Sequence, residues 1–203
     1  MTHRPISSVD ALMCLLAGCA GVWDSPDRSG DPVDILDHGL QVAALLAASR
    51  PDDEETQAAG LVHDIGHHLV PGDEAGHGTH AATAVEGLLG PRVARLVALH
   101  IPAKRYLAAT EPGLALSPES ARTLGCQGGA MSPAEAAAFR GRPGLRGGTR
   151  AAPRRRRRKG RRPAGTAPGE LAAGPGARRR EPRSGGVRRM LMCSWWDCGG
   201  VPL

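Results

Sequence analysis

The segment Gly60-Leu-Val-His-Asp-Ile-Gly-His-His68 decides the fold, because an apolar helix ends there on two adjacent polar side chains. Helical spacing leads into His63 and Asp64, and Gly66 then stops the helix. A neutral imidazole beside a carboxylate is a good ligand pair for a hard or borderline metal ion, and a helix end holds both rigidly. The segment therefore predicts a metal site.

Three further histidines lie inside or at the end of their own apolar-periodic segments: His38 upstream, and His80 and His100 downstream. Four imidazoles and a carboxylate from four helices can converge in the core of a bundle, as they do in dimetal sites. The pattern therefore predicts an all-α bundle built around these side chains. His68 and His77 fall in polar surroundings and are expected to face solvent.

Helical segments are expected over 8–20, 35–46, 52–64, 79–89 and 93–100, with two shorter ones after 116 and 132. Gly90-Pro91 predicts a break, and Ile101-Pro102 predicts the end of the segment that carries His100. Ser132 followed by Pro133 and Glu135 is the pattern of a capping box with proline at the first helical position. All eight histidines precede residue 139.

The charge of the chain changes sign near Phe139. Residues 1–138 carry 8 Lys and Arg against 17 Asp and Glu, a net charge of −9, and residues 139–203 carry 18 against 3, a net charge of +15. We therefore expect one domain over 1–139 and a disordered Arg/Gly/Pro/Ala-rich tail over 140–203, since such a composition buries too little apolar surface to offset chain entropy.

Two interpretations of the tail remain open. A genuine basic tail would bind nucleic acid nonspecifically, without a functional role. A reading-frame shift in a G+C-rich gene would also produce this composition, and it explains an abrupt change inside a helix. We favour the frame shift.

Cysteine usage and hydropathy indicate the cellular compartment in which we expect the protein. Five cysteines without a C-x-x-C pair argue against a disulfide framework and fit a reducing cytoplasm. No apolar run approaches the ~20 residues of a membrane span, so no membrane partner is expected. Leu16-Ala-Gly-Cys19 looks like a lipoprotein cleavage box, but Asp10 interrupts the short apolar run before it, and a helix is the favoured interpretation.

The spaced histidines around the His-Asp pair resemble the HD-domain superfamily of metalloenzymes. The resemblance covers roughly residues 8–139 and narrows to one branch, the HD-domain oxygenases of phosphonate breakdown, which cleave a carbon–phosphorus bond at a mixed-valent di-iron centre. The segments that carry it are Leu36-Asp-His38, His63-Asp-Ile-Gly-His67, Thr79-His80, His100-Ile-Pro-Ala-Lys-Arg-Tyr-Leu107, Leu116-Ser-Pro-Glu-Ser120 and Gln127-Gly-Gly-Ala-Met131.

The resemblance implies a role for each matching residue. Asp64 would bridge two irons, with His38 and His63 on one iron and His80 and His100 on the other. Lys104 would face the substrate phosphonate, Ser120 and Gln127 would donate hydrogen bonds to its oxygens, and His67 would lie behind the ligands or face the substrate.

Two positions depart from the family pattern. The family expects a last Asp ligand in an Arg-x-Trp-Asp context after the point where this chain turns basic, and none stands in register; Trp196-Asp197 has different surroundings. Arg28-Ser-Gly-Asp31 stands where a family member has a substrate-gating Tyr-x-x-Glu. Asp31 would replace the Glu at the amine end of the substrate, and the Tyr is absent.

The resemblance implies a cytoplasmic iron-dependent oxygenase of phosphonate catabolism. It would use dioxygen and two irons to convert a 1-hydroxy-2-aminoethylphosphonate-like compound to phosphate and an amino acid. One alternative is an HD-type phosphohydrolase with a single divalent metal such as Mn, Mg or Ni, whose metal-bound hydroxide attacks a phosphoester. Another is a truncated, inactive metal-binding remnant.

Overall fold

The computed structural model describes residues 5–24, 33–114, 116 and 118–142, which belong to one compact unit. Within these ranges the secondary structure is helical without a strand, which confirms the all-α class. Asp31, the predicted contact of the amine end of the substrate, lies outside the described residues, as does the predicted tail over 140–203 except for its first three residues. The helices are α1 (Val9–Gly18), α2 (Ile35–Ser49), α3 (Glu54–Val62), α4 (Ile65–Leu69), α5 (His77–Thr110), α6 (Pro118–Cys126) and α7 (Pro133–Arg140).

Asp34 sets the start of α2 and ties it to the end of α1. Its carboxylate accepts hydrogen bonds from the backbone N–H of Asp37 at 2.9 Å and of Gly21 at 2.8 Å. The first bond caps α2, and the second joins a residue 13 positions earlier. Because His38 lies in the first turn of α2, this cap also fixes the position of its imidazole along the helix axis.

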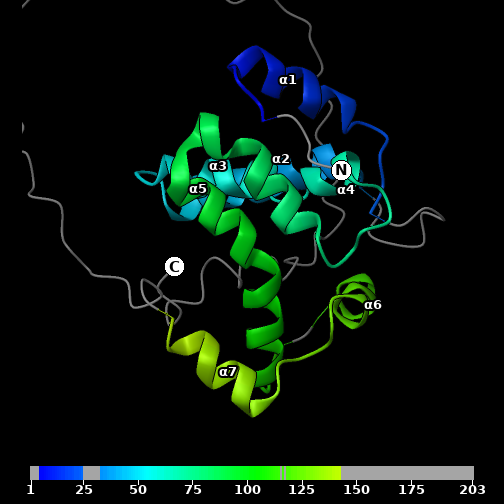
Figure 1. Ribbon diagram of the computed structural model, residues 1–203, viewed down its shortest axis with the longest axis vertical. Helices are drawn as coiled ribbons and strands as arrows, with labels where there is room; N and C mark the ends of the chain where they lie inside the picture. The colour runs from blue at the N-terminus through cyan, green and yellow to red at the C-terminus, as the bar shows by residue number, and fades with distance from the viewer. Residues whose placement is uncertain (1–4, 25–32, 115, 117, 143–203) are drawn as a thin grey trace, which may run out of the picture. The chain divides into compact units, whose positions relative to one another are not determined.

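Helices α2 and α3 lie side by side because glycine stands at both contact points (Figure 1). A Cβ on Gly39 would collide with the carbonyl oxygen of Leu61, and a Cβ on Gly60 would collide with the side chain of Leu46. The two backbones therefore approach more closely than larger residues allow. This approach brings His38 on α2 next to His63 at the end of α3.

Helix α5 is bent at Gly90, whose φ of 87° lies in the left-handed region, and Pro91 then starts the second part. The expected end at Ile101-Pro102 is wrong, because α5 continues through Pro102 to Thr110. The missing hydrogen bond at Pro102 is outweighed by burial on both sides of it, at Ile101, Ala103, Tyr106 and Leu107. The continuation puts His100 and Lys104 one turn apart on the same face.

Helix α7 packs against the second part of α5, where the rings of Phe139 and Tyr106 lie 5.2 Å apart. The predicted capping box is present, since Ser132 and Glu135 exchange side-chain to backbone hydrogen bonds. Arg105 on α5 connects this helix to the α6–α7 loop and to α7, because it donates to the Gly129 carbonyl at 2.9 Å and to the Glu135 carboxylate at 3.0 Å. The loop between α6 and α7 is thereby fastened to α5, next to Lys104. In the part of the chain that the structure describes, no helix is both long and apolar enough to cross a membrane.

Gly66 offers a test of the contact between α4 and α5. A Cβ at this position would collide with the backbone carbonyl of His77, so we expect Gly66→Ala to force the two helices apart and to lower the free energy of unfolding by about 3 kcal/mol or more. Urea unfolding followed by circular dichroism measures the change.

Gly87→Ala is the matched control for this substitution. Gly87 is helical and exposed on α5, and a Cβ there meets nothing within 4 Å. We expect it to raise stability by about 0.5–1 kcal/mol, because alanine restricts the unfolded chain. Equal effects of the two substitutions would contradict the close contact at Gly66.

Candidate metal centre

His63 and Asp64 lie at the junction between α3 and α4, where the backbone leaves one helix and begins the next. Asp64 is the N-cap residue of α4, but its side chain makes no capping hydrogen bond. The carboxylate points instead into the bundle, with 18% of the side chain exposed. The helix junction therefore presents a nearly buried carboxylate to the side chains in the interior of the bundle.

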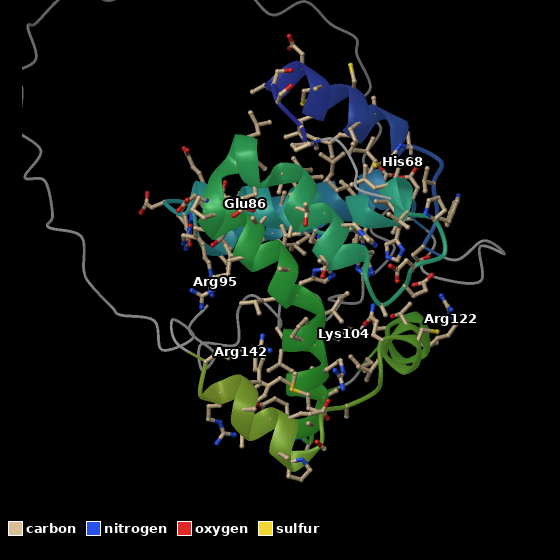
Figure 2. All side chains as sticks on the ribbon, in the orientation of Figure 1. His68, Glu86, Arg95, Lys104, Arg122 and Arg142 are labelled. Carbon is tan, nitrogen blue, oxygen red and sulfur yellow. The ribbon has the colours of Figure 1, made fainter. Side chains whose placement is uncertain are left out.

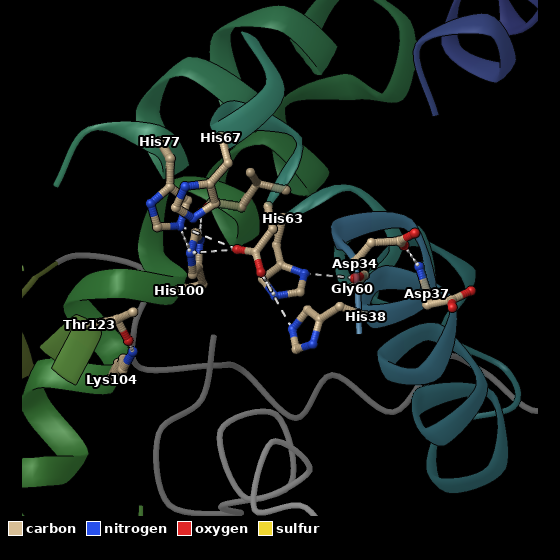
Figure 3. A network of polar contacts seen from close by, with 12 residues as sticks. Asp34, Asp37, His38, Gly60, His63, His67, His77, His100, Lys104 and Thr123 are labelled. Carbon is tan, nitrogen blue, oxygen red and sulfur yellow. Dashed lines mark hydrogen bonds and ion pairs between the residues drawn. The ribbon is translucent and has the colours of Figure 1, made fainter. Parts of the chain in front are cut away.

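Four imidazoles surround this carboxylate in two pairs, one pair for each oxygen (Figure 3). The Nε2 atoms of His38 and His63 lie 3.4 and 3.2 Å from Oδ2 of Asp64. The Nε2 atoms of His77 and His100 lie 3.3 and 3.6 Å from Oδ1. A carboxylate in this position can bridge two cations.

The outer nitrogens of three of these imidazoles are occupied by backbone carbonyls. Nδ1 of His63 lies 2.8 Å from the Gly60 carbonyl, and Nδ1 of His100 lies 2.6 Å from the Val97 carbonyl. His77 uses the Glu74 carbonyl in the same way, at 2.8 Å. When Nδ1–H donates to the carbonyl three residues earlier, the neutral form of each ring turns an unprotonated Nε2 toward Asp64.

Two contacts fit a cation in this space. The Nε2 atoms of His77 and His100 are 2.9 Å apart, so two lone pairs face each other unless a positive charge lies between them. The Nε2 atom of His38 is buried and forms no hydrogen bond with any described residue. The donor atoms form two sets within ligand range of each other, and Asp64 belongs to both. The residues present therefore fit a pair of metal ions.

The protonation states agree with this arrangement. Burial lowers the pKa of His38 to about 4, and it lowers that of His100 well below its ordinary value with help from the neighbouring imidazoles. Burial opposes the charge of His63 too, but the Asp64 carboxylate outweighs it and raises that pKa. Burial alone would raise the pKa of Asp64, yet His63 and the other imidazoles hold it well below its usual range. An ionised carboxylate among largely neutral imidazoles is a donor set for divalent cations.

The structure differs from the expectation at His80. Its Nε2 lies 2.8 Å from Oδ2 of Asp73, its side chain is 30% exposed, and it is not in either donor set. His77 takes the expected place, and its interpretation as a solvent-facing loop residue is wrong, since it is 2% exposed. His77-Gly78 repeats His38-Gly39, but the repeat gains a meaning only from the structure, where both glycines stand at close contacts.

The imidazoles and Asp64 line a pocket that is partly open to solvent, and its empty space together with the open solvent at its mouth is about 600 Å³. Lys104 lies on the side of α5 that faces α6 (Figure 2), is 5% exposed, and donates to Oγ1 of Thr123 at 2.6 Å. The buried Oε1 of Gln127 accepts no hydrogen bond from any described residue. The predicted substrate-side residues that line the pocket are His67, Lys104, Ser120 and Gln127.

Thr123 and His67 also lie at this pocket. Thr123 lines the same pocket and was not expected there; its position one turn after Ser120 on α6 was the available signal. His67 is 8% exposed and stacks on His77 with ring centroids 3.9 Å apart. Asp31 lies outside the described residues, so its expected role stays a prediction, as do the ligand and substrate roles of the others.

Comparison with known proteins shows the family to which the chain belongs. The sequence profile of the HD domain matches residues 35–125, which include Asp64 and all four imidazoles. A [1-hydroxy-2-(trimethylamino)ethyl]phosphonate dioxygenase (glycine-betaine-forming) of Leisingera caerulea is 33% identical over 139 residues, covering 62% of this chain and 70% of that protein. The chain belongs to the HD domain family.

A second relative of this HD-domain protein is the hydroxymethylphosphonate dioxygenase of Gimesia maris. It is 36% identical over 124 residues, covering 56% of this chain and 61% of that protein, so the HD-domain protein spans less than two thirds of it. Both relatives are named phosphonate dioxygenases, and these names support the interpretation of this chain as an oxygenase. Together with the two His/Asp sets, they support a metal cofactor.

Substitution of Asp64 tests the shared carboxylate. We expect Asp64→Ala to abolish binding of both metal ions, because each donor set loses its only carboxylate oxygen. Metal content per chain, measured by plasma mass spectrometry after reconstitution with Fe(II), gives the result. The exposed Asp52→Ala is the matched control and should keep the wild-type content. Two metals retained in Asp64→Ala would contradict the bridging position.

A second prediction concerns pH and the metal-free protein. Burial lowers the pKa of His67, like that of His38, to about 4. Between pH 6.5 and 4 the unfolded chain binds more protons than the folded chain, so stability falls as the pH falls through this window. His67→Gln removes one such site and should reduce the loss by up to about 3 kcal/mol. Urea unfolding at pH 7 and pH 4.5 in the presence of a chelator measures it, and identical losses would contradict a neutral buried His67.

Proposed function

We propose that this protein is a di-iron oxygenase that cleaves the carbon–phosphorus bond of a 1-hydroxyalkylphosphonate. The observation that carries the proposal is the division of the Asp64 carboxylate between two pairs of imidazoles. Each set contains two histidines and one carboxylate oxygen and leaves coordination positions open. This donor set is typical of non-haem iron oxygenases.

The names of the relatives support the substrate class. Hydroxymethylphosphonate and [1-hydroxy-2-(trimethylamino)ethyl]phosphonate share a hydroxyl on the carbon that bears phosphorus, and they differ at the amine end. A 1-hydroxy-2-aminoethylphosphonate-like compound has the same reacting group. We therefore propose the shared C(OH)–P unit as the reacting part, with the amino compound as the favoured substrate.

The side of the pocket formed by α5 and α6 suits the phosphonate group. Lys104 is a buried cation, and its attraction for a dianion is stronger there than in water. Thr123 accepts from Lys104 and donates to the Ser120 carbonyl at 3.3 Å, which fixes the direction of the ammonium group. Gln127 adds an amide beside them. We propose that these side chains hold the phosphonate while its hydroxyl faces Asp64 and the imidazoles.

The proposed reaction balances with dioxygen as the only co-substrate. The aminoethyl substrate and one O₂ give glycine, phosphate and one proton: the carbon–phosphorus bond breaks, carbon gains the oxygen that completes a carboxylate, and phosphorus gains the other. Dioxygen accepts four electrons, which come from the C–H and C–P bonds. Irons at the two donor sets would supply the Lewis acidity and the electron transfer that this reaction requires.

His67 fits a supporting place at the substrate. Its imidazole is neutral at physiological pH, because burial holds its pKa near 4, and it lines the pocket beside His77. A neutral ring can exchange a hydrogen bond with bound substrate without adding charge. We propose this hydrogen-bonding role for it.

The test of the proposal is the oxygen dependence of phosphate release. Protein reconstituted with Fe(II) under anaerobic conditions is mixed with 1-hydroxy-2-aminoethylphosphonate, and in parallel with hydroxymethylphosphonate. We expect no phosphate before air is admitted, and phosphate with a matching consumption of dioxygen afterwards. Comparison of phosphate release from the two substrates shows whether the amine end contributes to turnover.

Other outcomes contradict the proposal. Phosphate release at the same rate with and without air, or turnover of a phosphomonoester such as p-nitrophenyl phosphate alone, would identify a metal-dependent phosphohydrolase. Iron-loaded protein that releases no phosphate in any of these assays would indicate an inactive metal-binding remnant.

Lys104→Ala tests the phosphonate side of the pocket. Loss of the buried cation should lower kcat/KM about 10- to 100-fold, mainly through a higher KM, because one charged hydrogen-bonding partner of the dianion is removed. Steady-state dioxygen consumption measures the change. The exposed Arg95→Ala on the same helix is the matched control and should behave like wild type. An unchanged KM in Lys104→Ala would contradict its place at the phosphonate.

A further inference from the structure

The turn before α5 is closed by one carboxylate. Oδ1 of Asp73 accepts a hydrogen bond from the backbone N–H of Gly76 at 2.9 Å, and Oδ2 lies 2.8 Å from Nε2 of His80. Gly76, the N-cap residue of α5, has no side chain with which to cap the helix. A Cβ on Gly76 would collide with the Asp73 carboxylate, so this closure requires glycine. Asp73 therefore joins the turn to the first turns of the helix.

This turn contains the carbonyl that orients His77. Nδ1 of His77 lies 2.8 Å from the carbonyl oxygen of Glu74, which stands between Asp73 and Gly76. His63 and His100 use carbonyls of Gly60 and Val97, which are held by the regular backbone of α3 and α5. The Glu74 carbonyl, in contrast, lies outside a helix, so its position depends on what closes the turn.

We propose that Asp73 and His80 form a positioning pair for His77, and hence for the metal site that His77 and His100 share. The inference rests on the metal centre of the proposed function. His80 is then a support of the centre rather than a ligand of it. The two side chains are 43% and 30% exposed, and an exposed pair contributes little to global stability. The effect of the pair is therefore expected in the affinity of one metal site.

The test is a double-mutant cycle on the full chain with metal affinity as the readout. His80→Ala and Asp73→Ala should each weaken one of two bound divalent cations about 10- to 100-fold, as loss of a ligand's support does, and leave the other unchanged. The double substitution should weaken it no further than Asp73→Ala alone, because His80 has no pair left to form once Asp73 is removed. His80→Gln should keep most of the wild-type affinity, since its amide can donate to Asp73. Titration with Co(II), followed by its absorption spectrum, measures both sites without turnover.

A control variant separates this role from a general effect on the helix. Thr83→Ala removes a side-chain hydrogen bond to the Thr79 carbonyl one turn further along α5 and should leave both cations bound as in wild type. Melting temperatures of the chelator-treated variants should stay close to that of wild type.

Several results would overturn the positioning role. Equal weakening in His80→Gln and His80→Ala would make His80 a ligand, and wild-type affinity in His80→Ala would leave the pair without a role. Wild-type protein that binds no divalent cation would overturn both the inference and the proposed function. Wild-type protein that binds two cations but releases no phosphate in air would overturn the proposed function alone.

Discussion

The structure depends on the placement of one carboxylate, that of Asp64, among four imidazoles. Removing an ionised carboxylate from water costs several kcal/mol, and His63 and the other imidazoles offset that cost, since they hold the pKa of Asp64 well below its usual range. Burial lowers the pKa of His38 and of His100, so these two neutral rings offer the carboxylate no full positive charge. The facing nitrogens of His77 and His100 add repulsion. Two cations would convert each of these unfavourable contacts into a bond. Cations bound at these donor atoms would therefore stabilise the folded bundle.

Short side chains can meet at one point only if the helices that carry them approach closely. Glycines stand at the contacts of α2 with α3, of α4 with α5, and of the start of α5 with His100: Gly39 and Gly60, Gly66, and Gly78. A Cβ on Gly78 would lie 2.8 Å from the His100 ring. These glycines weaken helix propensity locally, and the structure tolerates that loss because close approach is what brings the imidazoles to Asp64.

Helix α5 sets the relation between the metal centre and the substrate side of the pocket. It carries His77 in its first turn, His100 after the bend at Gly90, and Lys104 one turn later. Because the helix continues through Pro102, a rigid element rather than a loop fixes the separation between the imidazole of His100 and the ammonium group of Lys104. α6 lies beside this segment through the bond from Lys104 to Thr123. Such rigidity would keep the proposed phosphonate at a constant distance from the proposed metal site.

Local patterns in the sequence determined the all-α class, the capping box at Ser132 and the set of donor atoms available for chemistry, because helix periodicity and capping act within a few residues. The tertiary structure alone decided which imidazole faces Asp64. His77 and His80 are three residues apart, and the choice depends on where α5 begins and on the partner that Asp73 provides across the turn. The path through Pro102 was likewise decided by burial against distant residues. These outcomes depend on distances between backbones far apart in the chain, which no local pattern encodes.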